Sequence, residues 1–168
     1  MKRTLVTSDP HLGHERAAFH RGFDTVEEHD ELIIFNWNRK ARPTDTVYLL
    51  GDAVFRQSTA LSLLGRLNGI KNLILGNHEH HDISKYLPYF RKIMAMVIYK
   101  ERYIFTHVPV HPSQFNRFVG LVNVHGHIHK GQDELYIHDK RYFNVNMDFH
   151  NLTPLYIEEL DQLIKERV

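Results

Sequence analysis

The chain has no cysteine, so disulfide bonds and thiolate metal sites are both excluded. It also lacks an apolar run long enough for a signal peptide or a membrane-spanning helix, and we therefore expect a cytoplasmic protein without a membrane partner. Neither sign of charge is in excess, because 21 Lys and Arg stand against 20 Asp and Glu. Such a balance does not indicate a dedicated nucleic-acid-binding protein, although it allows a local basic patch.

Histidine is the residue type that the chain has in unusual number, with 14 in 168 residues. Eight of the histidines come shortly after predicted strands. They are His11, His14, His78, His107, His111, His125, His127 and His129. A general polar bias would scatter them along the chain, so this placement favours a shared chemical role.

Five short apolar runs, each bounded by turn residues, predict buried strands. Polar side chains follow each run: Asp9 and His11 after residues 5–8, Asp52 after 47–51, Asn77 and His78 after 73–76, His107 after 103–106, and His125, His127 and His129 after 122–124. In open sheets, ligands gather beyond the carboxyl ends of the strands. The five ends can therefore converge on one place, and their side chains predict a metal site there.

The order of the predicted elements indicates an α/β protein, and a chain of this length favours one domain over residues 1–168. Predicted helices begin at Thr25, where Thr25 and Glu28 fit a capping box, at Ser58, after Asp82, and at Glu158. Strands are expected at Ile93–Tyr99, Arg102–Thr106, Leu121–Val124, Leu135–His138 and Tyr142–Asn146, with hairpin tips at Glu101 and at Asp139-Lys140. This order suggests two packed sheets covered by helices.

Two short motifs place candidate ligands two residues apart: Asp9-Pro10-His11 and His127-Ile128-His129. On an extended segment, residues i and i+2 point the same way, so each pair would reach one ion. The alternative is a capping or hydrogen-bonding pair for the first motif and a solvated strand face for the second. For Gly51-Asp52 and Gly76-Asn77 the alternative is a simple turn.

Seven side chains form the candidate ligand set. They are Asp9, His11, Asp52, Asn77, His107, His127 and His129. Oxygen and imidazole ligands suit manganese, iron, zinc, cobalt and nickel, with manganese as our first choice, whereas calcium prefers oxygen ligands alone. One ion needs about four to six ligands, so seven ligands and water indicate two divalent ions that share a carboxylate, about 3.5–4 Å apart.

In this order, the five blocks resemble those of the calcineurin-like metallophosphoesterases, and the resemblance runs from Asp9 to His129. It implies a four-layer α-β-β-α sandwich, in which two mixed sheets are flanked by helices. It also implies one ion bound by Asp9, His11, Asp52 and His129, and a second bound by Asp52, Asn77, His107 and His127. Asp52 would bridge the ions together with a water or hydroxide that attacks phosphorus, and His78 would protonate the leaving oxygen or stabilise the transition state.

Two features narrow the set of family members that the chain resembles. Ala53-Val54-Phe55-Arg56 follows Gly51-Asp52, where the serine/threonine protein phosphatases have an Asp-Arg-Gly block. The chain is also too short to hold the substrate domains of larger nucleotidases or DNA repair nucleases. We therefore expect similarity to the small, single-domain bacterial and phage members.

The expected activity is binuclear metal-dependent hydrolysis of a phosphomonoester or phosphodiester, by metal-activated hydroxide, on a small or nucleotide-like substrate. A cyclic-nucleotide phosphodiesterase or a nuclease is the alternative among enzymes, and a non-catalytic protein of the same fold is the alternative outside them. The candidate substrate contacts are His14, Arg21, Arg56 and His111, each with a solvated or structural role as its alternative.

Overall fold

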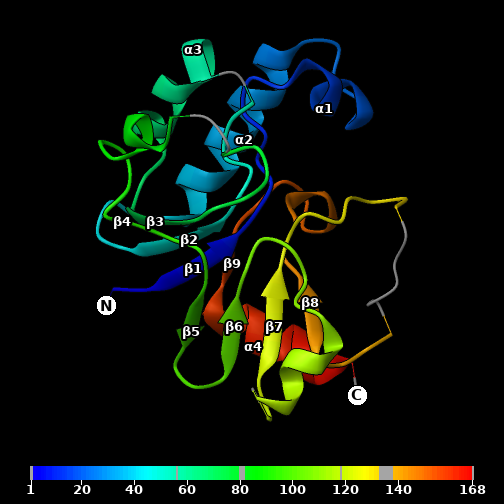
Figure 1. The fold of residues 1–168 in the computed structure, drawn as a ribbon. Coiled ribbons are helices and arrows are strands. Elements are labelled where there is room, and N and C mark those ends of the chain that lie inside the picture. Colours follow the sequence, from blue (N-terminus) through cyan, green and yellow to red (C-terminus); the bar gives the residue numbers. More distant parts are fainter. Residues whose placement is uncertain (1, 56, 80–81, 118, 133–137, 168) are drawn as a thin grey trace.

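The computed structural model describes residues 2–55, 57–79, 82–117, 119–132 and 138–167 (Figure 1). The strands are β1 (Thr4–Thr7), β2 (Thr46–Leu50), β3 (Ile70–Ile74), β4 (Lys92–Met94), β5 (Val97–Tyr99), β6 (Tyr103–Phe105), β7 (Val122–His125), β8 (Tyr142–Asn144) and β9 (Leu155–Tyr156). The α-helices are α1 (Glu15–His20), α2 (Val26–Lys40), α3 (Gln57–Ala60) and α4 (Ile157–Glu166). Short 3-10 helices are η1 (Leu61–Arg66), η2 (Ile83–Tyr86), η3 (Pro112–Asn116) and η4 (Met147–Phe149).

The strands form two mixed sheets flanked by helices (Figure 1). The first sheet has the order β4-β3-β2-β1-β9, in which β1 to β4 are parallel and β9 runs antiparallel to β1. The second sheet has the order β5-β6-β7-β8, in which β6 to β8 are parallel and β5 is antiparallel to β6. This architecture confirms the predicted fold class.

Both faces of the central strands are buried, which explains their continuous apolar runs. Successive side chains of a strand point to opposite faces of the sheet. Leu49 and Leu73 therefore pack in one core with Trp37 of α2. Their neighbours Leu50 and Ile74 pack in a second core, with side chains of β6 and β7. The second core holds the two sheets together.

The helix predicted from the capping box is confirmed as α2. The Oγ1 atom of Thr25 accepts a hydrogen bond from the N–H of Glu28 at 3.2 Å, and the helix ends at Lys40. Trp37 is fully buried on the inner face of the helix. The last predicted helix, Glu158–Glu166, is confirmed as α4, which begins one residue earlier.

The helix predicted from Ser58 is only partly α-helical. It forms one turn as α3 and continues as the 3-10 helix η1, in which Leu64 is buried. Gly65 lies in the last turn of this segment, where glycine weakens a regular helix because it gives up more backbone freedom than other residues. The short helix after Asp82 is also a 3-10 helix, and Asp82 caps it by accepting the N–H of Ser84 at 3.0 Å.

The single strand predicted over Ile93–Tyr99 is wrong. The chain leaves the first sheet after Met94 and joins the second sheet at Val97, so β4 and β5 belong to different sheets. An apolar pattern does not reveal such a crossing, because the side chains on both sides of it are apolar. The hairpin tip at Glu101 is confirmed: Lys100 and Glu101 have φ of 51° and 53°, and the N–H of Arg102 donates to the backbone oxygen of Tyr99 at 3.1 Å, as in a type I′ turn.

Two short elements are not predicted by the sequence patterns. α1 and β9 are each shorter than the windows in which helical or strand periodicity becomes clear. The predicted strand Leu135–His138, and with it the hairpin at Asp139-Lys140, falls largely on residues outside the described ranges. Within the described ranges, the fold has no helix whose length and hydrophobicity would carry it across a bilayer.

Candidate metal centre

The carboxyl ends of the parallel strands in the two sheets meet at one place (Figure 1). Ser8, directly after β1, forms a parallel bridge with Asn146, shortly after β8, and this bridge joins the two edges. Gly126 allows their close approach, because a Cβ atom at that position would collide with the carboxylate of Asp9. Side chains that follow β1 to β3 therefore face side chains that follow β6 and β7.

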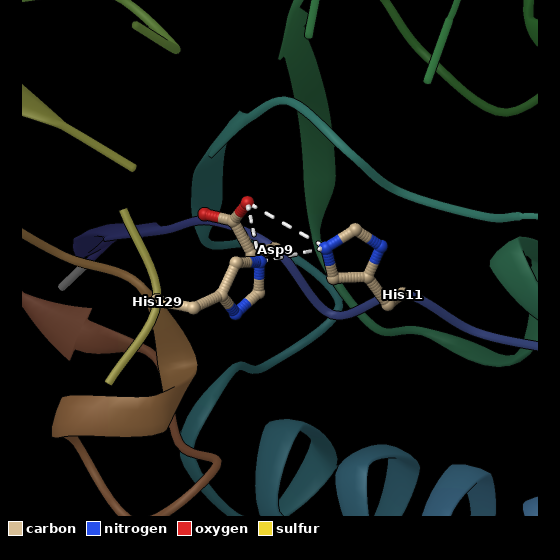
Figure 2. A group of neighbouring side chains, drawn as sticks. All are labelled: Asp9, His11 and His129. Carbon is tan, nitrogen blue, oxygen red and sulfur yellow. Dashed lines mark hydrogen bonds and ion pairs between the residues drawn. The ribbon is translucent and has the colours of Figure 1, made fainter. Parts of the chain in front are cut away.

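The first group of converging side chains is Asp9, His11 and His129, which Figure 2 shows turned toward one another. The Nε2 atoms of His11 and His129 are 3.1 Å apart. The Oδ1 atom of Asp9 lies 3.7 Å from Nε2 of His11 and 3.8 Å from Nε2 of His129. Two atoms that each lie about 2.1 Å from one ion are between about 3.0 Å and about 4.2 Å apart, depending on the angle between them, so the three atoms can surround a single ion.

The second group is Asn77, His107 and His127. The Oδ1 atom of Asn77 lies 2.8 Å from Nε2 of His107 and 2.8 Å from Nδ1 of His127. The two imidazole nitrogens are 3.3 Å apart. This spacing also matches the ligands of one ion, and His127 presents Nδ1 where the other imidazoles present Nε2.

Asp52 lies between the two groups. Its Oδ2 atom is 3.7 Å from Nε2 of His11, and its Oδ1 atom is 3.4 Å from Nε2 of His107. The N–H of His78 donates to Oδ1 at 2.9 Å and holds the carboxylate in place. One oxygen therefore faces each group, which is what a bridging carboxylate requires. The structure brings all seven predicted ligands together in one site.

Several polar atoms of this site lack suitable hydrogen-bond partners in the protein, and bound cations would satisfy them. Asp9 is fully buried, and its Oδ1 atom has no hydrogen-bond partner among the described residues. An unpaired buried carboxylate oxygen is costly. The facing Nε2 atoms of His11 and His129 need a proton between them unless both direct their lone pairs at a cation. Divalent ions would satisfy these atoms, so the residues fit the predicted metal centre.

The predicted geometry of the two short motifs is wrong. Asp9 and His11 have φ of 57° and 49°, and His127 has φ of 68°, so neither motif is extended. The left-handed backbone is costly for residues other than glycine and is typical of functional sites. Asp9 and His11 nevertheless reach one group, whereas His127 and His129 turn to different groups instead of chelating one ion.

Hydrogen bonds behind two of the imidazoles select the nitrogen that faces the site. Nδ1 of His107 donates to the backbone oxygen of Leu50 at 2.8 Å. Nδ1 of His129 donates to Oδ2 of Asp148 at 2.8 Å. Each bond keeps the Nε2 lone pair available for a metal ion, and a carboxylate partner also makes the imidazole a stronger ligand.

Arg21 is a predicted substrate contact, but its guanidinium is engaged by the protein itself. It pairs with Asp148 at 2.7 Å and donates to the backbone oxygens of Asp9 at 2.8 Å and Pro10 at 3.1 Å. Its Nη1 atom also lies 2.8 Å from Nε2 of His29. Because a guanidinium has five N–H donors, these contacts leave it little to offer a substrate, and they indicate the structural alternative.

Glu79 is a residue of the site that the sequence patterns do not reveal. Its buried carboxylate accepts hydrogen bonds from the N–H groups of Asp52 at 2.9 Å, Ala53 at 2.7 Å and Gly76 at 2.7 Å. Burial raises the pKa of Glu79, and these amide hydrogen bonds oppose that effect. Glu79 ties the loop after β2 to the loop after β3, so it positions both Asp52 and Asn77.

His78 and His14 lie on the open side of the site. Nε2 of His78 is 3.7 Å from Oδ2 of Asp52, and the side chain is 27% exposed. The ring of His14 lies 6.1 Å from that of His78 and stacks on Phe55, with centroids 3.8 Å apart. Both imidazoles can therefore reach a molecule bound beside the ligand groups.

The remaining candidate histidines lie elsewhere. His111 caps η3, where its Nδ1 atom accepts the N–H of Ser113 at 3.3 Å, and no contact among the described residues joins it to the ligand groups. His125 is buried, and its Nδ1 atom donates to the backbone oxygen of Gly126 at 2.9 Å. Arg56 falls outside the described ranges.

Burial and neighbouring charges shift the pKa values of the candidate ligands, upward for Asp9 and His107 and downward for Asp52. Burial raises the pKa of Asp9 to about 6. Burial also favours the neutral form of Asp52, but the hydrogen bond and charge of His107 outweigh it and lower the pKa of Asp52. Burial opposes the charge on His107 as well, yet the nearby carboxylates of Asp52 and Asp9 raise its pKa. Without metal, Asp52 and His107 therefore form an ion pair that a bound cation would replace.

Comparisons with known proteins agree with this geometry. A family model described as calcineurin-like phosphoesterase matches residues 2–166. "Uncharacterized protein MJ1445" of Methanocaldococcus jannaschii is 32% identical over 99% of this chain and 93% of its own length. "Gene 66 protein" of Mycobacterium phage L5 is 40% identical over 47% of this chain and 41% of its own length.

A solved structure shares the fold. It is that of protein AQ665, of unknown function, from Aquifex aeolicus, with a TM-score of 0.79 and 22% identity over 97% of this chain and 100% of that one. The family match and the clustered Asp and His side chains together support metal-dependent hydrolysis of phosphoesters. Because the family model spans nearly the whole chain, including every strand end that carries a ligand, the chain belongs to the calcineurin-like phosphoesterase family.

Proposed function

We propose that the protein hydrolyses phosphoesters with two divalent ions, for which manganese is the first choice. Asp9, His11, Asp52 and His129 would hold one ion, and Asp52, Asn77, His107 and His127 would hold the other. The observation that carries the proposal is the position of Asp52, whose two oxygens lie 3.7 Å from His11 and 3.4 Å from His107.

Divalent ions held there would lower the pKa of a water molecule and offset the negative charge of the phosphoryl oxygens. Asp52 stays ionised at neutral pH because its pKa is lowered, so it can serve both ions at once. His78 lies at the open side of the site, 3.7 Å from Asp52, and this position supports the proposal that His78 protonates the leaving oxygen.

The proposed substrate is a small phosphorylated molecule such as a nucleotide, and the proposed location is the cytoplasm. Hydrolysis of a cyclic nucleotide or of nucleic acid is the alternative. The partial exposure of His78 is compatible with either, because it leaves the site open to a diester as well as to a monoester.

The test is a manganese titration of metal-depleted protein, with hydrolysis of p-nitrophenyl phosphate and bis(p-nitrophenyl) phosphate followed at each point. We expect two ions per chain and hydrolysis of at least one ester that depends on manganese. The preferred ester separates a phosphomonoesterase from a phosphodiesterase. A titration in which no ion binds, or metal-loaded protein that hydrolyses neither ester, would overturn the proposal.

A further inference from the structure

A cleft opens directly beside the metal centre. Its volume is about 830 Å³, and His11, His78 and His129 lie at its inner end. Small-molecule sites typically have volumes of roughly 300–1,000 Å³. Most of the cleft therefore lies beyond the place where a phosphoryl group would meet the ligand groups, and that space belongs to the rest of the substrate.

Two exposed cations are among the lining residues of the cleft. Arg16 of α1 and Lys130, in the loop after β7, line it and are exposed. Within the described part of the chain, neither cation forms an ion pair with a carboxylate. Asp148 is the acidic residue among the described lining residues, and Arg21 and His129 already pair with it at 2.7 Å and 2.8 Å. The two cations are thus available to an anion in the cleft.

Part of the wall of the cleft is apolar. Phe55 is 37% exposed, although its ring stacks on His14 and lies 5.4 Å from the ring of His78. Leu152 and Met147 also line the cleft. A ligand in the cleft can therefore contact metal ligands, an apolar surface and two cations.

We propose that the substrate is a small phosphoester that carries a second anionic group, which Arg16 and Lys130 bind. This inference rests on the proposed function, because it assigns the inner end of the cleft to the phosphoryl group that reacts. A bare phosphate ester would leave both cations without a partner. The nearly balanced charge of the chain, 21 basic against 20 acidic residues, favours a small ligand over nucleic acid.

The experiment compares two competitive inhibitors of the hydrolysis of the generic ester by manganese-loaded protein. Adenosine 5′-monophosphate and adenosine 3′,5′-bisphosphate differ only in the second phosphate. We expect the bisphosphate to bind at least about 10-fold more tightly, as charge-assisted hydrogen bonds to two cations allow. In Arg16→Ala and Lys130→Ala, the inhibition constant of the bisphosphate should rise about 5- to 10-fold, whereas that of the monophosphate should not.

Lys165→Ala is the matched control, because Lys165 is exposed on α4 and does not line the cleft. It should leave both inhibition constants unchanged. Hydrolysis of the generic ester without any advantage of the bisphosphate would overturn this inference and leave the proposed function intact. So would an advantage that survives both substitutions, or tighter binding of a single-stranded oligonucleotide. No hydrolysis of either generic ester would overturn the proposed function instead, and this inference with it.

Discussion

The two sheet edges that build the metal centre supply different ligands and hold them in different ways. The first edge, after β1 to β3, provides Asp9, His11, Asp52 and Asn77, whereas the second edge, after β6 and β7, provides imidazoles alone. Asp9, His11 and Asp52 have left-handed backbones, as does His127 of the second edge, and Glu79 ties two loops of the first edge together. Two histidines of the second edge are instead oriented through their own side chains, by Leu50 and Asp148.

This difference indicates that the two edges have different structural roles, which we call the division of labour between them. The backbone of the first edge fixes where the ions sit, because its loops cannot move without breaking hydrogen bonds to buried groups. The second edge fixes the direction of the imidazole lone pairs, since a hydrogen bond to one ring nitrogen leaves the other for the metal. Changes to Asp52, or to the Glu79 contacts that hold two loops of the first edge, should therefore disturb both ions, whereas changes at the second edge should disturb one.

Asp52→Asn should have the largest effect, because it weakens both ions at once. A loss of several kcal/mol of metal-dependent stabilisation corresponds to about a 1,000-fold or greater decrease in kcat/KM. Metal content and hydrolysis of the generic ester are measured together. Two ions per chain and near-normal activity would show that Asp52 does not bridge the groups.

His78→Ala tests a residue of the first edge that is not a predicted ligand. Loss of a general acid should lower kcat by about 100-fold or more, with the metal content unchanged. The decrease should be smallest for an ester whose leaving group is a good one, such as p-nitrophenolate, and larger for an alkyl ester. If the variant loses metal, His78 is a ligand or a structural residue, and the ligands that we assign to the first edge are incomplete.

Glu79→Gln tests the support of the first edge. A glutamine amide cannot accept all three backbone N–H groups, so a buried donor loses its partner and the free energy of unfolding should fall by about 1–3 kcal/mol. Both ions should bind more weakly, because Asp52 and Asn77 lose a common support. Urea unfolding and metal titration measure the two effects, with the exposed Glu158→Gln as the control. Weakening of only one ion would contradict the division of labour.

Asp148→Asn tests the second edge. His129 would lose its carboxylate partner, and such outer contacts typically contribute about 10- to 100-fold to metal affinity. Only the ion held by the group of Asp9, His11 and His129 should be affected. Manganese titration should therefore resolve one weakened and one unchanged binding step, and the exposed Asp24→Asn should behave as the unaltered protein.

The pH dependence of metal binding should show the smallest and most graded effect. In metal-free protein the pKa of His107 is raised to about 9, so this imidazole is protonated at neutral pH and must release its proton to bind an ion. Metal affinity should thus rise with pH from about 7 to 9. Asp9, with a pKa of about 6, contributes few protons in this window. Burial opposes the charge on His129, but its hydrogen bond to Asp148 and the nearby carboxylates raise its pKa, so His129 adds to the release. Calorimetry in buffers of different ionisation enthalpy counts the protons, and zero release would contradict the ion pair of His107 with Asp52.

The sequence by itself determined which strands are buried and which residues follow them. Apolar runs such as Val47–Leu50 are continuous because both of their faces are covered, and continuous runs are easy to recognise. The capping box at Thr25 located α2, because a cap is a contact between residues close in the chain. Local signals of this kind predicted the ligand positions and the fold class.

Only the tertiary structure decided how the ligands are grouped. The left-handed backbone of Asp9 and His127 is stable only because distant parts of the chain hold it, so the spacing of two residues predicted a wrong geometry. The roles of Glu79 and Arg21 depend on partners far along the chain, and no pattern near either residue indicates them. The break between β4 and β5 was hidden for the same reason. A local sequence pattern is compatible with several conformations of such a segment. Hydrogen bonds and packing between distant parts of the chain decide which of them forms.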